Sequence, residues 1–458
     1  MVITQLHRGD RRLVFADSRT RVEETAAGLR ASGVRTLVSH ASLSRDERRQ
    51  AETAFAEEPD CVIVATSTLE LGLDVGDLDR VIQVGAPPSV ASFLQRMGRT
   101  GRRSGSERNC LFLATSDEEF LICLALVKLW REGKVDPVVA PPRPAHIFAQ
   151  QVMALSLQLG GISRREISLW LGDVVDAVPE AERDAIVYHM LESGVLAEDA
   201  GILMLGTRGE QEFGARHFSD LVAAFSAPLL ISVRSGPTDL GTVHPASLVP
   251  GRTGDPAVLS LGGRSWMVGH IDWRRRTVAV VPSESAGRSH WFGTGRALSG
   301  TVCMTIERIV AGAEPTCRLS RRAEAALDQI RDRLAFVDAD SLSMVSDGRG
   351  RVVIWAFAGS AATGSIAAGL AARGFEVIGF DDLAIALRTG DREGVAKAIS
   401  RIDPVSIHPK LPEDIGLSLK FGLCLPVEIV RSVLKARTAD PASVAAICRR
   451  SPQLIYAA

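Results

Sequence analysis

The fold is decided by residues 65–103, which read ATSTLELGLDVGDLDRVIQVGAPPSVASFLQRMGRTGRR. Near the end of this stretch, Arg99 and Arg102 are three residues apart, and each follows a glycine. Guanidinium groups at this spacing lie on one side of a helix or tight turn, and each forms a planar fork that fits phosphate oxygens. The glycines leave room for a close approach to a crowded anion. The stretch therefore predicts a phosphate-binding element.

Short apolar runs alternate with segments of helical periodicity over residues 13–114. Asp17 with Ser18, and Ser44 with Glu47, are capping signals for the first two helices. Strands that alternate with helices form a parallel sheet with right-handed crossovers, and ligands bind at the carboxyl ends of such strands. The segment after Ala65 begins at one of these ends. The expected strands are residues 13–16, 36–40, 61–65, 81–84 and 111–114.

Three consecutive segments resemble one helicase family. Residues 95–102, QRMGRTGR, resemble motif VI of superfamily 2 helicases, and residues 65–75, ATSTLELGLDV, resemble motif V. The segment between them, VIQVGAPPSVASFLQR at residues 81–96, is similar to the Lhr (large helicase-related) family. In those enzymes two RecA-like lobes enclose one ATP, and the second lobe supplies arginine fingers. The resemblance implies an α/β fold in which a RecA-like parallel-sheet lobe comes first.

The resemblance also implies roles in nucleotide binding. Arg99 and Arg102 are expected to contact the ATP phosphates, with Gln95 beside them. Gly72 and Asp74 are expected near the ribose of the nucleotide. No residue is assigned to a metal within this chain.

A simpler interpretation is that Arg96, Arg99, Arg102 and Arg103 form a solvated basic face, as most runs of charge do. Here two of the arginines each follow a glycine, and the surrounding segments are expected to form a strand, a loop and a helix. Motif V also lies at the distance that the family requires. These features favour the functional interpretation.

Four residues are expected to contact nucleic acid from this lobe. The resemblance places Thr66 and Ser67 on a DNA phosphate. Arg19, in SRT, resembles the family's N-S-R element, although Asp17 replaces the usual asparagine. His40, in SHASLSRDER, resembles the HHSSLS element. A lone histidine at the end of a strand is equally well a structural residue, so both interpretations of His40 stay open.

The pattern changes after residue 118, where helices predominate. Three helices followed by a hairpin make a winged helix. The candidate recognition helix, residues 180–193, is acidic, which argues against base reading in the major groove and favours a scaffold role. The expected elements are a helix at 120–130, a proline-rich connector at 135–144, helices at 146–159, 163–171 and 179–193, and a hairpin within 194–205.

The remaining chain is an expected α+β domain. Residues 221–310 are rich in strands and read as a small β-barrel or sheet, and residues 311–458 mix helices with strands. Three short elements again resemble the Lhr core, namely LGGRSW at 261–266, WAFAG at 355–359 and LKFGLCLP at 419–426. The expected domains are a second RecA-like lobe at 1–118, a connector with the winged helix at 119–220, and a family-type fourth domain at 221–458.

Four tryptophans are candidates for stacking on an unpaired base, an interaction of about 1–3 kcal/mol. Trp355 lies in an apolar strand and is expected in a core. Trp291 lies in a glycine-rich segment, and because Lhr enzymes stack a fourth-domain tryptophan on the translocating strand, it is the candidate chosen here. Trp273 precedes three arginines and is a second possible contact, although that run also suits a solvated hairpin end. Trp266 is a further core candidate.

Composition limits the class of protein. The 458 residues carry a formal net charge of −1, so a nucleic acid must be met by local basic patches. The 7 cysteines include no C-x-x-C pair and no zinc spacing, which indicates reduced thiols. No apolar run is long enough to span a bilayer, and a signal peptide is absent. A cytoplasmic protein without a membrane partner is expected.

Two motifs of the first RecA-like lobe are absent from these residues, namely G-x-x-x-x-G-K-[ST] and D-E-x-H. Without them nothing cradles the β- and γ-phosphates or holds Mg²⁺. We therefore expect the C-terminal part of an Lhr-like 3′-to-5′ DNA helicase that is inactive alone. ATP and Mg²⁺ would be held mainly by a first-lobe polypeptide carrying both motifs, and the nucleic-acid partner would be single-stranded DNA or a DNA/RNA hybrid.

Two other functions stay open. The chain could be a non-catalytic nucleic-acid-binding or regulatory module, or a decayed gene fragment, that retains the helicase C-terminal fold. It would then bind single strands in a salt-dependent way without responding to ATP. A sequence-specific winged-helix regulator is the third possibility, which the acidic recognition helix disfavours.

Overall fold

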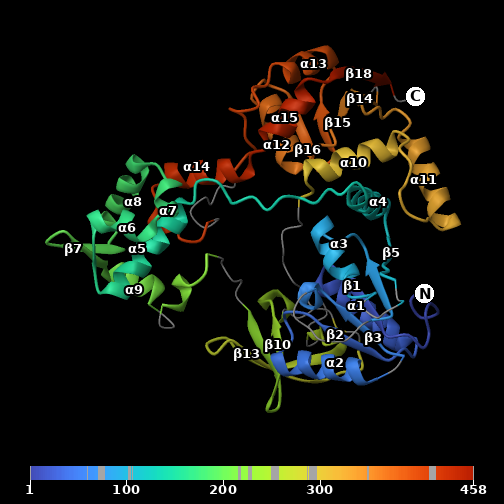
Figure 1. Ribbon diagram of the computed structural model, residues 1–458, viewed down its shortest axis with the longest axis horizontal. Coiled ribbons are helices and arrows are strands. Elements are labelled where there is room, and N and C mark those ends of the chain that lie inside the picture. The colour runs from blue at the N-terminus through green and yellow to red at the C-terminus, as the bar shows by residue number, and fades with distance from the viewer. Residues whose placement is uncertain are drawn as a thin grey trace. The chain divides into compact units, whose positions relative to one another are not determined.

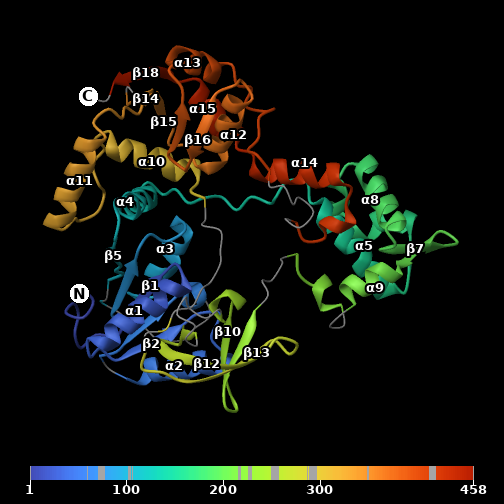
Figure 2. The same ribbon diagram turned by 180° about the vertical axis from the view of Figure 1, so that it is seen from behind.

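The computed structural model describes residues 2–58, 60–70, 78–101, 105, 107–214, 218–224, 230–248, 257–285, 287, 297–347, 350–411 and 419–456. They form two compact units, each made of two separate stretches (Figures 1 and 2). Unit 1 comprises Met1–Pro137 and Pro228–Ala339, and unit 2 comprises Val138–Ala227 and Asp340–Ala458. The stretch expected as one domain at 221–458 is therefore divided between the two units.

Unit 1 contains the expected parallel sheet, and the predicted α/β class is confirmed. Its strands are β1 (Arg12–Ala16), β2 (Thr36–Ser39), β3 (Val62–Ala65), β4 (Arg80–Val84) and β5 (Leu111–Leu113), in the order β2-β3-β1-β4-β5. All pairings are parallel. The crossover helices are α1 (Arg19–Ala31), α2 (Arg45–Glu57) and α3 (Val90–Met97).

The capping signals and the alternation of side chains explain this layered lobe. Ser18 accepts a hydrogen bond from the Arg21 amide, and Ser44 accepts one from the Glu47 amide, so each begins a helix. Along β1, Val14 belongs to the core that includes α1, whereas Phe15 belongs to the core that includes α2. The two faces of the sheet are therefore covered by different helices, as a parallel sheet requires.

A second sheet covers the α1 side of the lobe. Its strands are β9 (Ile231–Ser235), β10 (Thr238–Val243), β11 (Val258–Leu261), β12 (Arg264–Asp272) and β13 (Thr277–Pro282), in the order β10-β9-β13-β12-β11. Trp266 and Leu259 share one core with Val22 and Leu29 of α1. Trp266 is buried, and its indole N–H donates to the Leu261 carbonyl at 2.9 Å. The strand-rich stretch therefore packs as a sheet on the lobe.

Three further helices complete unit 1. They are α4 (Asp117–Arg131), α10 (Gly300–Val310) and α11 (Arg321–Arg333), and α4 packs against α10. Trp130 of α4 meets Phe93 of α3 edge-on, with ring centroids 5.5 Å apart. None of the helices in the described part of the chain is both long and apolar enough to cross a membrane.

Unit 2 begins with the expected winged helix. Its elements are α5 (Ala145–Leu159), β6 (Ile162–Ser163), α6 (Ile167–Leu171), α7 (Asp173–Asp176), α8 (Glu180–Glu192), β7 (Leu196–Asp199), β8 (Ile202–Leu205) and α9 (Thr207–Phe213). The three strands form a small sheet in the order β6-β8-β7. The helix predicted from residue 163 starts later, because Ser163 pairs in β6 and caps a 3-10 turn.

The rest of unit 2 is a mixed sheet flanked by helices. Its strands are β14 (Ser341–Ser346), β15 (Arg351–Trp355), β16 (Glu376–Phe380), β17 (Ala384–Arg388) and β18 (Ser451–Tyr456), in the order β16-β17-β15-β14-β18. The sheet is flanked by α12 (Ser360–Ala371), α13 (Arg392–Ser400) and α15 (Pro441–Cys448), whereas α14 (Val427–Thr438) packs in the core of the winged helix. Trp355 is half-buried and stacks on Phe357, with ring centroids 5.7 Å apart.

Helix α8 is held by distant residues of its own unit, which favours the scaffold role. Ile186 and Met190 share a core with Phe421 and Val433. The His189 Nε2 atom also lies 3.2 Å from the Leu423 carbonyl oxygen. A helix that packs against the C-terminal segment and carries an acidic sequence is poorly suited to enter a DNA groove.

A buried histidine ties α5 to α14 within this core. His146 is 2% exposed, and its Nε2 atom accepts a hydrogen bond from the Arg437 guanidinium at 2.9 Å. Burial, with a smaller contribution from the charge of Arg437, lowers the pKa of His146 from 6.5 to about 4. The neutral imidazole is therefore the form that this packing stabilises.

We predict that acid weakens unit 2 through His146. The folded-state pKa lies below the unfolded value, so the stabilisation is complete above pH 6.5 and is lost as the pH falls toward 4. The loss is on the order of 3 kcal/mol. Urea unfolding at pH 7 and pH 4.5 measures this loss. Between these two pH values the free energy of unfolding should fall less for His146→Gln than for the unsubstituted chain, because glutamine keeps an acceptor but does not titrate. Parallel pH profiles for the two proteins would contradict this assignment.

Candidate active site

Polar residues follow neighbouring strands at the carboxyl edge of the parallel sheet. Asp17 and Arg19 follow β1, and Thr66 and Ser67 follow β3. Because β1 and β3 pair in parallel, these residues leave the sheet at the same edge. Thr66 is half-buried and Ser67 is exposed, which leaves the Ser67 hydroxyl accessible to a ligand. The structure thus brings together the residues expected to bind DNA after β1 and β3.

One buried arginine joins the loops at this edge. Arg96 of α3 is 2% exposed. Its Nε atom donates to Glu70 Oε1 at 2.8 Å, its Nη1 atom donates to Asp17 Oδ1 at 2.8 Å, and Nη1 also donates to the Gln83 amide oxygen. The guanidinium lies 5.0 Å from the ring centroid of Phe15. Arg96 therefore connects α3 to β1, β4 and the motif V segment.

Arg99 is also buried, at 7% exposure, and donates from Nη2 to the backbone carbonyl of Glu70. Glu70 consequently binds both arginines, Arg96 through its carboxylate and Arg99 through its backbone. The interpretation of these arginines as a solvated face is wrong for Arg96 and Arg99, because carboxylate and carbonyl oxygens draw them into the interior. Gln95, which precedes Arg96 on α3, is exposed.

Glu70 is the residue of this site that sequence reasoning missed. It is 8% exposed and lies within motif V, four residues after Thr66. A buried carboxylate requires a cationic partner. The sequence signal that could have predicted this pairing is a glutamate that lies inside a mostly apolar motif and close to a run of arginines. Burial raises the pKa of Asp17, and the charge of Arg96 opposes that shift.

Gly101 has a different role from the one expected of it. Its φ is +72°, which favours glycine, and an added Cβ would lie 2.5 Å from the Arg108 amide nitrogen. The turn after α3 therefore needs glycine because another part of the chain approaches it closely. The expected reason was space for an anion.

His40 and Glu23 form a buried pair. His40 is fully buried, and its Nε2 atom lies 2.8 Å from Glu23 Oε1. Glu23 also accepts hydrogen bonds from the Gly262 amide at 2.6 Å, from the Ser260 hydroxyl at 3.3 Å and from the Gly263 amide. The pair joins the lobe to the second sheet, and this arrangement favours the structural interpretation of His40.

Several predicted site residues have no structural description. Gly72, Asp74, Arg102 and Trp291 all lie outside the described residues. Among the other candidates, Arg19 is the half-buried first residue of α1, and burial lowers its pKa.

Sequence comparison identifies this lobe. Residues 1–104 match the family described as helicase conserved C-terminal domain. The chain is 28% identical over 275 residues to the Lhr helicase/probable uracil glycosylase of Mycolicibacterium smegmatis, a match that covers 56% of this chain and 18% of that protein. A match to the Lhr helicase/uracil glycosylase of Escherichia coli has the same identity over 281 residues. The first 104 residues therefore form a helicase C-terminal domain, and the sequence of this chain is similar to that of Lhr helicases.

Structural comparison extends the likeness in fold to the whole chain. The structure of Mycobacterium smegmatis helicase Lhr bound to ssDNA and AMP-PNP matches with a TM-score of 0.60 and 18% identity, over 100% of this chain and 66% of that one. The ATP-dependent helicase Lhr-Core of Saccharolobus solfataricus is 32% identical over 153 residues, which are 32% of this chain and 18% of that protein. The matched stretches thus span under a fifth of the length of these curated relatives.

We predict that Arg96→Met destabilises unit 1 by about 3–5 kcal/mol, because it leaves the carboxylates of Asp17 and Glu70 without their cation. Urea unfolding of the full chain measures the change. Arg49→Met, which removes an exposed arginine of α2, is the matched control and should change stability by less than about 0.5 kcal/mol. Equal effects of the two substitutions would show that the Arg96 network contributes nothing.

Proposed function

We propose that this Lhr-family chain supplies the motif V and motif VI side of a composite ATP site in a 3′-to-5′ single-strand DNA translocase. The phosphate loop and the DExH motif, which are absent from these 458 residues, come from a first RecA-like lobe outside them. The observation that supports this proposal most is the double attachment of Glu70 to Arg96 and Arg99. It joins the arginine motif to the segment that begins with Thr66 and Ser67.

The attachment suits an arginine-finger motif because a finger accelerates phosphoryl transfer only when it is held in place. Arg96 fixes the end of α3 to the sheet, and residues 99–102 follow directly. In this proposal Arg102 is the principal finger and Gln95 lies beside it. Arg99 exchanges its bond to the Glu70 carbonyl for a phosphate oxygen, so that nucleotide binding is transmitted to motif V.

The side chains of this lobe suit phosphate oxygens better than a metal ion. Arginine forks and hydroxyl groups bind phosphate, whereas Mg²⁺ prefers carboxylate oxygens. Among the described residues of this edge, the carboxylates of Asp17 and Glu70 are both paired with Arg96. We therefore assign Mg²⁺ to the first lobe and only phosphate and ribose contacts, including those expected of Gly72 and Asp74, to this chain.

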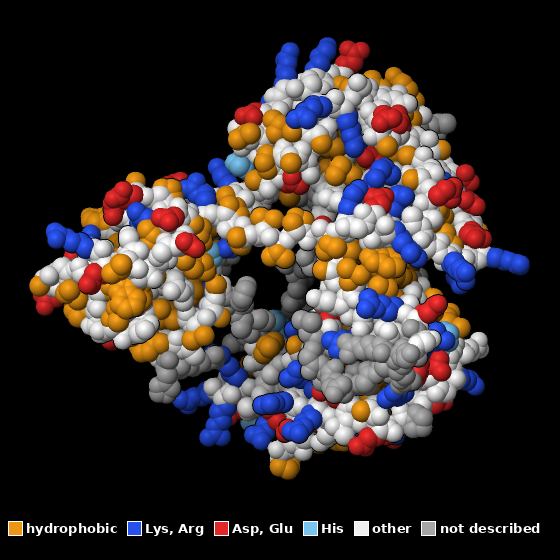
Figure 3. Space-filling model, viewed as in Figure 1, with side chains coloured by type: hydrophobic (Ala, Val, Ile, Leu, Met, Phe, Trp, Pro, Cys, Tyr) orange, Lys and Arg blue, Asp and Glu red, His pale blue; other side chains and the backbone are white. Residues whose placement is uncertain are grey.

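The same edge would receive the single strand. Ser67 and Thr66 would contact a backbone phosphate, and Arg19 would contact the strand from the start of α1. Lysine and arginine side chains are scattered among acidic ones in the view of Figure 3, which fits local contacts along a strand better than one broad basic face. The same proposal includes stacking of Trp291 on an unpaired base. It also includes a DNA/RNA hybrid as an alternative partner.

A reconstituted ATPase assay tests this function. This chain is mixed with a polypeptide that carries the phosphate loop and the DExH motif, together with single-stranded DNA and Mg²⁺. We expect ATP turnover to require both polypeptides, and Arg102→Ala to lower it by about 10³-fold or more. Arg49→Ala, an exposed arginine of α2, should leave turnover unchanged.

Turnover that is insensitive to Arg102→Ala would exclude the composite site. Salt-dependent binding of single strands with no response to ATP in the mixture would instead support the non-catalytic module. The two outcomes differ because strand binding, measured with and without ATP, does not require turnover, whereas turnover requires the assembled site.

A further inference from the structure

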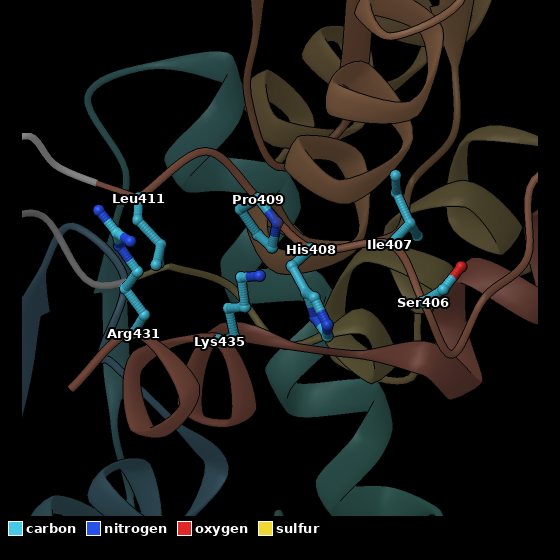
Figure 4. Close-up of a pocket in the computed structure, with 7 residues that line it drawn as sticks. All are labelled: Ser406, Ile407, His408, Pro409, Leu411, Arg431 and Lys435. Atoms are coloured by element: carbon cyan, nitrogen blue, oxygen red, sulfur yellow. The ribbon is translucent and has the colours of Figure 1, made fainter. Parts of the chain in front are cut away.

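Unit 2 contains a pocket of about 510 Å³ (Figure 4). It lies between α14 and the segment at residues 406–411. None of the described side chains that line it is acidic. The volume is within the range of pockets that hold a small molecule or a nucleotide, roughly 300–1,000 Å³.

One wall of the pocket is cationic. Arg431 and Lys435 are four residues apart on α14 and therefore lie on the same helix face. In Figure 4 both side chains rise from the helix toward the segment that carries His408 and Pro409. Among the described residues, no carboxylate lies within ion-pair distance of Lys435, and Arg431 pairs at 3.0 Å only with the exposed Glu428 of its own helix. Such an exposed pair contributes little and yields readily to a stronger anion.

The opposite wall is mostly apolar. Ile407, Pro409 and Leu411 provide the apolar surface. His408 lies between them, and its Nδ1 atom is buried without a hydrogen-bond partner among the described residues. Two cations facing an apolar wall match a ligand with an anionic end and a less polar body.

We propose that this pocket binds a phosphate-bearing ligand, with the phosphate on Arg431 and Lys435 and the sugar or base against Pro409 and Ile407. One nucleotide unit of a single strand has this chemistry, and so does a free mononucleotide. The strand is the occupant that we favour, because an opening to solvent admits a continuous chain, and this choice of occupant rests on the proposed function. The phosphate site itself does not depend on the composite ATP site.

Binding measurements on the full chain test the proposal without ATP or a first lobe. Fluorescence anisotropy follows a labelled single-stranded thymidine oligonucleotide between 50 and 200 mM salt, and calorimetry follows inorganic phosphate and thymidine monophosphate at constant ionic strength. We expect Lys435→Ala to weaken the oligonucleotide complex roughly fivefold and to reduce the salt slope by about 0.7 per lost phosphate contact. Lys435→Arg should restore most of the affinity.

Lys397→Ala is the matched control, because it removes an exposed lysine of α13 in the same unit. Loss of phosphate or mononucleotide binding with unchanged oligonucleotide affinity supports a free ligand as the occupant. Unchanged affinity for all three ligands in Lys435→Ala, or an equal loss in Lys397→Ala, overturns the proposal. Failure of the ATPase reconstitution leaves this test unaffected.

Discussion

The parallel-sheet lobe depends on one buried cation. Arg96 is enclosed by Asp17, Glu70 and Gln83, which come from three different segments of the sheet edge. A buried guanidinium is tolerated only when its donors are satisfied, so these segments cannot separate without exposing charge to an apolar interior. The same network fixes motif V beside motif VI. The geometry of the region proposed to bind phosphate therefore depends on the buried ion pairs of Arg96.

Another buried charge, Glu23, attaches the second sheet to the lobe within unit 1. Glu23 of α1 is satisfied by His40 and by backbone amides of Gly262 and Gly263. The Thr242 amide also donates to the Ser42 carbonyl at 2.6 Å. Together with the shared apolar core, these bonds attach the second sheet to the lobe, even though long stretches of sequence separate them. The segment around His40 therefore joins two parts of one unit.

Local patterns predicted much of this architecture. The five parallel strands, the caps at Ser18 and Ser44, and the winged helix follow from periodicity and turn chemistry, which act over a few residues. The division of residues 221–458 between two units and the pairing of Glu23 with His40 were not predictable, because they depend on contacts between segments far apart in sequence. Arg96 and Arg99 look alike in the sequence, and only the buried oxygen atoms around them reveal that both point inward. The roles of all the predicted ligand-binding residues remain predictions from resemblance, and Gly72, Asp74, Arg102 and Trp291 also lie outside the described residues.

The most direct test of the account is the coupling free energy between Arg96 and Glu70. A double-mutant cycle of Arg96→Met and Glu70→Gln, measured by urea unfolding of the full chain, isolates it from the separate effects of the two substitutions. We predict a coupling of about 2 kcal/mol or more, with the double variant less destabilised than the sum of the single variants. Additive effects, within about 0.5 kcal/mol, would contradict the claim that this pair holds motif V to motif VI.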